Sequence, residues 1–357
     1  MYRRGSTRRE TLVRVRSPSD VEALFRAYYR LRPELGLPPD FDSREFAFQP
    51  WRTDSYVRHK SFKTVEELHE FLAAEHPRQA YFSIAVYEIP DAPRMEEKSL
   101  QRAWLMFDVD IDPGECGLNT PILGDECLEK AYTYAERIAL ILERDFDMKT
   151  VITFTGHRGF HVIAGSEESG TLGKTARRRI AEYVEARGLD VWRIIPRPRK
   201  GARPVRPTRD DPGWRGWVAH AIQGIGDDWL DRLEEALAEW RPRIDALVTQ
   251  DPSRLERIHG SLHGKAGLLA VPMNHGLLLS ARVLSPFRGE VEVVPREDVE
   301  ATLLGYKITL RRGRREPVPA WLGLYLALRG LVDGIEGEVV VRAHTGWRPL
   351  QDGDWPP

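Results

Sequence analysis

The sequence has few cysteines and no long apolar run. Its 357 residues include only two cysteines, Cys116 and Cys127. Two thiols cannot cross-link a chain of this length, and they are too few for a four-ligand zinc site without other residues. We therefore expect a reducing, cytoplasmic setting. No apolar stretch approaches the roughly 20 residues of a membrane span, and the N-terminus has no signal-peptide core, so we expect a soluble protein without a membrane partner.

The sequence also lacks an excess of charge of either sign. Lys and Arg number 53 and Asp and Glu number 54, for a formal net charge of -1. The molecule as a whole therefore has no field that would attract a polyanion, and any binding of nucleic acid must come from local patches. Apolar residues make up 41% of the chain, which supports one large domain or two ordinary ones and excludes disorder over the whole length.

Hydrophobic periodicity indicates alternating strands and helices. Strand-like runs at 80–89 and 103–111 precede a helical pattern at about 126–144, and a further pair of strands follows. This order predicts an α/β or α+β fold with a mixed sheet flanked by helices. Residues 168–240 differ, with helical patterns around a Pro/Arg-rich stretch. We interpret them as an inserted, mainly helical subdomain within a single domain spanning 1–357.

An aspartate pair lies in the second of these runs. Side chains alternate along a strand, so Asp108 and Asp110 share one face of it while Phe107, Val109 and Ile111 share the other. Two such carboxylates repel by up to about 4 kcal/mol at 4 Å and an effective dielectric near 20. A divalent cation such as Mg²⁺ or Mn²⁺ removes that penalty. The alternative is that both aspartates lie on a solvated edge.

A glycine-bracketed turn at 155–161, with the sequence TGHRGFH, is a second candidate. Glycines let backbone amides approach a phosphate, Arg158 adds a forked cation, and His161 can donate to a phosphate oxygen. These features are typical of a triphosphate-binding turn. The alternative is an ordinary hairpin with a solvated tip.

A third segment, 245–267, begins with the acids Asp245 and Asp251 and continues with a basic series. The basic series consists of Arg254, Arg257, His263 and Lys265. One acid could complete a metal site, and the cations could hold a triphosphate. The alternative is a charged loop of mutually paired side chains.

Together these segments resemble the catalytic (small) subunit of the archaeal and eukaryotic replicative DNA primases. The resemblance rests on Arg44-Glu45-Phe46 with Arg58 before the Ser-Phe pair at 61–62, on the aspartate pair, and on the turn at 155–161. It also rests on Asp245, which lies eighteen residues before the histidine of the Leu-His-Gly-Lys-Ala-Gly element at 262–267. The similarity runs from about residue 20 to about 335.

The resemblance implies a DNA primase that makes short primers on single-stranded DNA from nucleoside triphosphates and releases pyrophosphate. It implies two Mg²⁺ or Mn²⁺ ions held by Asp108, Asp110 and Asp245, with Asp251 as the alternative third carboxylate. It implies a catalytic role for Glu45, although Glu45 and Arg58 could instead form a buried ion pair that braces the N-terminal hairpin. The residues expected to bind the nucleotide are Arg58, Thr155, Gly156, Arg158, Gly159, His161, Arg257, His263 and Lys265.

The chain departs from the family at 114–128, where many members carry a zinc knuckle. Cys116 and Cys127 occupy the outer ligand positions, but Leu118 and Gly124 occupy the inner ones and cannot coordinate a metal. We therefore interpret 114–128 as a degenerate zinc knuckle and predict no zinc, or at best a weak site completed by nearby acids or water. The two cysteines are expected to be relics or small core residues.

A basic segment at 193–209 has seven Lys or Arg residues and no acid. Such a patch can neutralise DNA phosphates, and Trp192, Trp214 and Trp217 beside it could offer surfaces on which bases stack. The residues expected to contact DNA are Arg197, Arg199, Lys200 and Arg203. The alternative is a solvated Pro/Arg loop.

The resemblance also implies a heterodimer with a primase large subunit. An apolar helical face in the insertion is a candidate contact, and packing onto its own domain is the alternative. This face is formed by Trp229, Leu230, Leu233, Leu237 and Trp240. Two other functions compete with primer synthesis. One is a primase-polymerase relative that mainly extends primers or fills gaps in repair, and the other is a catalytically silent scaffold that binds DNA or a partner.

Overall fold

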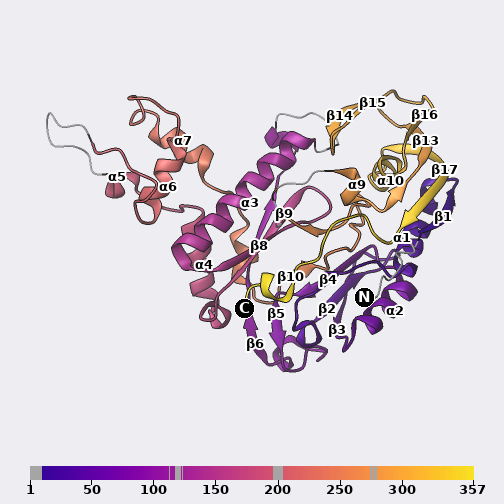
Figure 1. Ribbon diagram of the computed structural model, residues 1–357, viewed down its shortest axis with the longest axis horizontal. Coiled ribbons are helices and arrows are strands. Elements are labelled where there is room, and N and C mark those ends of the chain that lie inside the picture. The colour runs from indigo at the N-terminus through magenta and orange to yellow at the C-terminus, as the bar shows by residue number, and fades with distance from the viewer. Residues whose placement is uncertain are drawn as a thin grey trace, which may run out of the picture.

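Two four-stranded sheets lie at the centre of the computed structural model, which describes residues 10–111, 113–116, 122, 124–195, 204–273, 276 and 280–357. The first sheet has the order β11-β8-β9-β7. Its strands are β7 (Leu105–Asp110), β8 (Lys149–Phe154), β9 (Gly159–Gly165) and β11 (Val271–Pro272). The long helix α3 (Asp125–Phe146) covers one face of this sheet with an apolar stripe that repeats every three to four residues (Figure 1).

The second sheet has the order β10-β4-β2-β3 and packs against two N-terminal helices. Its strands are β2 (Phe46–Gln49), β3 (Val57–Lys60), β4 (Gln79–Ser83) and β10 (Leu255–Arg257), and the helices are α1 (Val21–Arg30) and α2 (Val65–Glu75). An aromatic cluster forms its core, with Phe48 and Phe71 ring centroids 4.5 Å apart and Phe46 and Phe62 5.2 Å apart. Burial of these rings fixes the hairpin that carries Glu45 and Arg58.

A third, five-stranded sheet brings the first and last strands of the fold together. The order is β1-β17-β13-β16, and β12 also pairs with β17. The strands are β1 (Glu10–Val15), β12 (Phe287–Arg288), β13 (Glu290–Pro295), β16 (Glu316–Pro319) and β17 (Val332–Arg342). The apolar helix α10 (Ala320–Leu328) packs on this sheet, and β14 (Val299–Leu303) and β15 (Tyr306–Leu310) form a hairpin beside it (Figure 1).

The other elements outside residues 174–240 are short. They are the two-stranded sheet of β5 (Ala85–Tyr87) and β6 (Leu100–Ala103), helices α8 (Ala246–Gln250) and α9 (Ala281–Leu284), and the 3-10 turns η1 (Pro18–Asp20), η2 (Phe41–Ser43), η3 (Met95–Glu97), η4 (Pro113–Cys116), η5 (Ser169–Thr171) and η6 (Asp352–Asp354). No helix among the described residues is long and apolar enough to cross a membrane.

The α+β class is confirmed, but the expected mixed sheet is wrong. Every strand pair in the described part of the chain is antiparallel. A strand, helix, strand order predicts parallel neighbours, yet β9 returns from β8 through a tight turn and lies between β8 and β7. The two strands joined by α3 are therefore not adjacent.

The segment expected to be an inserted subdomain begins with α4 (Lys174–Val184), which lies beside α3. The next helices, α5 (Val191–Ile194), α6 (Trp214–Ala221) and α7 (Leu233–Trp240), project beyond α3 and α4, away from β1 and β17 (Figure 1). Trp217 stacks on Trp240 at 5.6 Å, and the Arg144 guanidinium of α3 lies 3.3 Å from the centre of the Trp217 ring. These contacts dock the projecting helices on the C-terminal end of α3.

Two expectations for this segment change. Trp214 and Trp217 are only 6% and 2% exposed, so the interpretation that they offer stacking surface to DNA is wrong: they form the small core of the segment. Trp229, Leu233 and Leu237 of the proposed partner face are also buried. Their burial favours the alternative, packing within their own domain.

The C-terminal residues close the gap beside the first two sheets. Trp355 stacks between Trp104 and His259, at centroid distances of 5.8 and 5.0 Å. Arg44 covers the other side of Trp104 at 3.7 Å, so four planar groups lie in one stack.

Candidate active site

Asp108 and Asp110 project from the same face of β7, as the sequence predicts. In the register of β7 and β9, Asp108 lies opposite His161 and Asp110 lies opposite Gly159. Phe107 and Val109 are buried in the core, whereas Asp108 is partly exposed and Asp110 is exposed. The apolar half of this strand therefore holds the carboxylates at fixed positions on the side away from α3.

Acidic groups are concentrated around Asp108. Burial raises the pKa of this carboxyl, and the charges of Asp110, Glu256 and Asp245 raise it further, while His161 opposes them. A raised carboxyl pKa means that the site holds more negative charge than its surroundings stabilise. A bound cation would remove this penalty.

The charge of Asp245 is one of those that raise the Asp108 pKa, so Asp245 lies in the electrostatic surroundings of Asp108. Asp245 begins α8, and its Oδ1 accepts a hydrogen bond from the Leu247 N–H at 2.9 Å. Asp251 follows the same helix, and its carboxylate accepts from Ser253 and pairs with Arg254 at 3.5 Å. This placement supports the choice of Asp245 as the third carboxylate.

The donor chemistry of this site suits a hard divalent cation, because all three side chains offer carboxylate oxygens. As placed, however, no group of three or more His, Cys, Asp or Glu in the described ranges converges closely enough to hold a metal ion. Asp110 is paired with Arg158, and Asp245 caps its own helix. Joint coordination therefore requires these two side chains to change partners.

The turn between β8 and β9 is held tightly by its glycines. Gly156 has φ +84°, and a Cβ there would lie 2.8 Å from the Leu268 carbonyl oxygen. A Cβ on Gly159 would lie 2.2 Å from the Val109 oxygen. Thr155 donates from both its N–H and its Oγ1 to the Gly159 carbonyl, at 3.1 Å each. Only glycine allows this turn to pack so closely against β7.

Basic side chains from β10 and the following loop lie near this turn. Arg257 is buried and donates from Nη2 to the Tyr81 hydroxyl at 2.9 Å, while its Nε and Nη1 lack a hydrogen-bond partner in the part of the chain that the structure describes. Buried guanidinium donors are rarely left unpaired, and an anion such as phosphate would satisfy them. Lys265 is exposed nearby.

Two histidines add to the cluster. The His263 ring stacks on that of His157 with centroids 4.8 Å apart, and His263 Nδ1 accepts from the Lys265 N–H at 3.1 Å. Burial, followed by the Arg257 charge, lowers the pKa of His263 well below its usual value. Burial and the charge of Arg329 lower the pKa of His157 to about 3. Both rings are therefore neutral at pH 7.

The sequence analysis missed His157, Arg329, Tyr81 and Glu256. Arg329 Nη1 lies 2.7 Å from His157 Nε2. Glu256 is fully buried, and its Oε2 lies 3.0 Å from His161 Nδ1. An acid inside an otherwise basic series was the only signal for Glu256, because strand register across two sheets cannot be seen in the sequence.

Glu45 and Arg58 form an ion pair at the start of the N-terminal hairpin. Glu45 is fully buried, and its carboxylate accepts from Arg58 Nε at 2.8 Å and from the His59 N–H at 3.1 Å. Burial acts to raise the pKa of Glu45, but the Arg58 hydrogen bonds and charge hold it below its usual value. The geometry favours the structural alternative, an ion pair that braces β2 against β3. The catalytic role of Glu45 stays a prediction.

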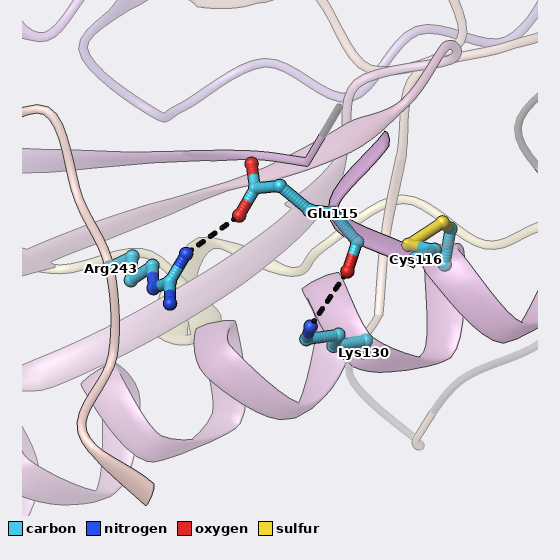
Figure 2. Close-up of a disulfide and its surroundings, with 5 residues drawn as sticks. Glu115, Cys116, Lys130 and Arg243 are labelled. Carbon is cyan, nitrogen blue, oxygen red and sulfur yellow. Dashed lines mark hydrogen bonds and ion pairs between the residues drawn. A yellow bond between two sulfur atoms is a disulfide. The ribbon is translucent and has the colours of Figure 1, made fainter. Parts of the chain in front are cut away.

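Cys116 and Cys127 form a disulfide that joins η4, just after the aspartate strand, to the first turn of α3 (Figure 2). Cys127 is buried in the core and Cys116 packs against it, which agrees with the expectation of small core residues, but their pairing was not predicted. Their Cα atoms are 5.8 Å apart, within the usual range for a disulfide. A disulfide has no thiolate to offer zinc. Gly124 precedes α3, and Leu118 lies outside the described residues.

Glu115, next to the disulfide, connects this region to the segment just before Asp245. Its side chain pairs with Arg243 at 2.9 Å, two residues before Asp245, and its carbonyl accepts from Lys130 Nζ at 3.3 Å (Figure 2). The predicted DNA contacts Arg197, Arg199, Lys200 and Arg203 lie outside the described residues.

The sequence is similar to those of known proteins. The family model of the DNA primase small subunit matches residues 107–275. The DNA primase small subunit PriS of Aeropyrum pernix is 45% identical over 345 residues, which are 95% of this chain and 100% of that protein. The PriS proteins of Sulfolobus acidocaldarius and Pyrobaculum aerophilum are each 35% identical, over 86% and 87% of this chain and 92% and 97% of their own lengths.

One solved structure is also similar. It is the polymerase domain from Mycobacterium tuberculosis ligase D in complex with DNA, with a TM-score of 0.37 and 11% identity. The similarity covers 71% of this chain and 80% of that one.

Proposed function

The chain belongs to the family of DNA primase small subunits, and we propose that it synthesises primers on single-stranded DNA by nucleotidyl transfer at Asp108 and Asp110. The observation that carries the proposal is the pairing of β7 with β9. This pairing brings two carboxylates on one strand face directly against His161 and Gly159 of the phosphate-binding turn. Acidic and basic groups therefore meet where a metal-bound triphosphate would lie.

In the proposed reaction, the 3′-hydroxyl oxygen of one nucleotide attacks the α-phosphorus of the next, the hydroxyl proton passes to solvent, and the bond from the α-phosphorus to the bridging oxygen breaks to release pyrophosphate. Asp108, Asp110 and Asp245 would hold two Mg²⁺ or Mn²⁺ ions, which when bound would activate the hydroxyl and neutralise charge on the α-phosphate. Binding requires Arg158 to leave Asp110, and its guanidinium is then available to the phosphates.

The other side of the triphosphate would face β10 and the loop after it. Nε and Nη1 of Arg257 are buried and have no hydrogen-bond partner among the described residues, and phosphate oxygens would satisfy them. Thr155, Gly156, Gly159, His161, His263 and Lys265 complete the proposed nucleotide site. Arg58 reaches it only indirectly, because Nε and Nη2 of its guanidinium already bond to Glu45.

Three further features are part of the proposal. The chain is one catalytic domain with an inserted helical subdomain at 168–240, and the segment at 114–128 replaces a zinc knuckle. Arg197, Arg199, Lys200 and Arg203 contact the template, so changing three of them to alanine should reduce the salt dependence of template binding. A large subunit is the expected partner, as the sequence resemblance implies.

The test is incorporation of labelled ATP or dATP on single-stranded DNA, with and without an annealed primer, in Mg²⁺ and in Mn²⁺. We expect primer-free synthesis by the wild type and none by Asp108→Asn or Asp110→Asn. Asp227 is an exposed aspartate of the projecting segment. Asp227→Asn is the matched control and should incorporate nucleotide as the wild type does.

Each alternative gives a different result. Extension of an annealed primer without primer-free synthesis would replace the proposal with a primase-polymerase that extends or repairs. Equal incorporation by wild type, Asp108→Asn and Asp110→Asn would show that these aspartates do not catalyse the reaction, and would favour the scaffold.

A further inference from the structure

One hydrogen bond connects the two central sheets beside the aspartate pair. His161 lies on β9 of the first sheet, and Glu256 lies on β10 of the second. His161 Nδ1 is 3.0 Å from Glu256 Oε2, and the other ring nitrogen, Nε2, is 3.7 Å from Asp108 Oδ1. The imidazole therefore bridges a buried carboxylate and a carboxylate of the proposed metal site.

Glu256 has the features of a residue that holds another side chain in place. It is fully buried, and its Oε1 accepts from the Arg257 N–H at 3.0 Å. With one oxygen bound to its own backbone and the other to His161, the carboxylate cannot turn without losing both bonds. Burying a charge of this kind is costly unless it is paired and hydrogen-bonded, so its partner group is tightly constrained as well.

We propose that Glu256 is a positioning residue for nucleotidyl transfer. It holds the His161 ring through Nδ1, so that Nε2 is directed at Asp108 and at the phosphates that bind beside it. This inference rests on the proposed function, and it adds a residue that touches neither metal nor substrate. It resembles the way in which outer carboxylates orient histidines at metal sites, where their loss costs about 10- to 100-fold in activity or metal affinity.

A purely structural role is the alternative, in which Glu256 only ties the two sheets together. The structure provides a matched control, because Thr153 Oγ1 and His259 Nε2 form a second buried hydrogen bond, at 3.0 Å, between β8 and the residues just after β10. Thr153 lies directly opposite His161 on β8, so its burial and location are similar. Within the described residues, Thr153 forms no hydrogen bond with an aspartate of β7.

The test compares Glu256→Leu, Glu256→Gln and Thr153→Val. The Leu variant removes the acceptor, and the Gln variant keeps one. We expect Glu256→Leu to lower kcat about 10- to 100-fold with a smaller change in the KM for template, and Glu256→Gln to fall between it and the wild type. Thr153→Val should lower the melting temperature and leave kcat and KM unchanged.

A measurement that does not depend on activity is the ¹⁵N spectrum of the histidine rings. The His161 signals, assigned by their loss in His161→Gln, should shift in Glu256→Leu and stay in place in Thr153→Val. Activity of the double variant is the second check. Because Glu256 is proposed to act through His161, Glu256→Leu should cause little further loss in a His161→Gln background.

Three results would overturn the inference. They are unchanged His161 signals in Glu256→Leu, wild-type kcat in that variant, or a loss of activity on Glu256→Leu substitution that is equally large in the wild-type and His161→Gln backgrounds. The proposed function fails differently: wild-type protein that incorporates no nucleotide would remove that function and this inference with it. If the wild type is active but Glu256→Leu changes neither kcat nor the His161 signals, only the inference fails.

Discussion

Arg158 Nε lies 3.0 Å from Asp110 Oδ2, so the cation of the turn at 155–161 is paired with one of the two aspartates of β7. Both side chains are about 40% exposed, and the pair can therefore open at little cost. The same arginine is placed to exchange a carboxylate for a phosphate without leaving the site. The proposed mechanism depends on this exchange.

Replacing Arg158 tests the exchange. We expect Arg158→Ala to raise the KM for nucleoside triphosphate by about 10-fold or more, because hydrogen bonds to charged groups contribute about 1.5–3 kcal/mol. Arg158→Lys keeps the charge but not the forked guanidinium, so its KM for nucleoside triphosphate should lie between those of the wild type and Arg158→Ala. Arg187→Ala, an exposed arginine at the end of α4, is the control. An unchanged nucleotide KM in Arg158→Ala would contradict the assignment.

Asp108 should cost the protein stability. Its raised pKa means that the folded state binds the proton more tightly than the unfolded chain does, so stability is lost as the pH rises from the ordinary value of 3.8 through the raised one. Asp108→Asn should therefore abolish incorporation and raise the melting temperature at pH 7. This gain in melting temperature should vanish below pH 3.8. A lower melting temperature of Asp108→Asn than of the wild type at pH 7 would show instead that the folded protein stabilises the ionised Asp108 carboxylate.

Glu45, unlike Asp108, should stabilise the folded protein at neutral pH. Its lowered pKa contributes stability that is present above the unfolded value of 4.5 and is lost as the pH falls through the folded value. We expect Glu45→Gln to destabilise the protein at pH 7 by on the order of 1–3 kcal/mol, with a smaller difference in acid. Denaturant unfolding of the wild type and Glu45→Gln at pH 7 and in acid measures this difference in stability. A large loss of kcat at unchanged stability would instead support the catalytic role.

The disulfide should stabilise the fold measurably. Cys116 and Cys127 are 11 positions apart, and closing a loop of this size contributes about 3 kcal/mol in the chain-entropy description. A reducing agent should lower the denaturation midpoint of the wild type and leave that of a Cys116→Ser, Cys127→Ser variant unchanged. Metal analysis belongs to the same experiment. Stoichiometric zinc that survives dialysis of the reduced protein against a chelator would contradict the absence of a zinc site.

Trp355 should be the most sensitive aromatic position near the C-terminal end of the chain. Removing a buried Trp costs about 3–5 kcal/mol, and here the ring separates Trp104 from His259. Trp355→Ala should lower the free energy of unfolding by that amount, and Trp355→Phe by less. Equal stability of Trp355→Ala and wild type would show that the stack is not formed in solution.

The part of the site that depends on local pattern could be predicted from the sequence. Alternation along one strand was enough to place Asp108 and Asp110 on a common face, and the glycines of the turn at 155–161 were recognisable from spacing. The α+β class also followed from the order of elements. These features depend on neighbours within a few residues, which a single sequence displays directly.

Features that depend on long-range register could not be predicted. The contact between His161 and Glu256 spans 95 positions and two sheets, and nothing local specifies it. The mixed sheet was wrong because β9 lies between the strands that α3 connects. The tryptophans of the projecting segment were placed on the surface because composition does not distinguish a stacking face from a small core. The disulfide could not be predicted because two cysteines eleven positions apart reveal neither the distance between their Cα atoms nor their redox state.

The pairing of β1 with β17 has a consequence for biosynthesis. Glu10 and Arg342, which pair at one end of these strands, are separated by 332 positions. At about 5–20 residues per second, β1 waits roughly 15–70 s on the ribosome before its partner is made. During that time the strand, including Leu12, offers an unpaired edge to other nascent chains. The third sheet can therefore be completed only after nearly the whole chain is made. Until then, β1 of the nascent chain is a natural binding site for chaperones.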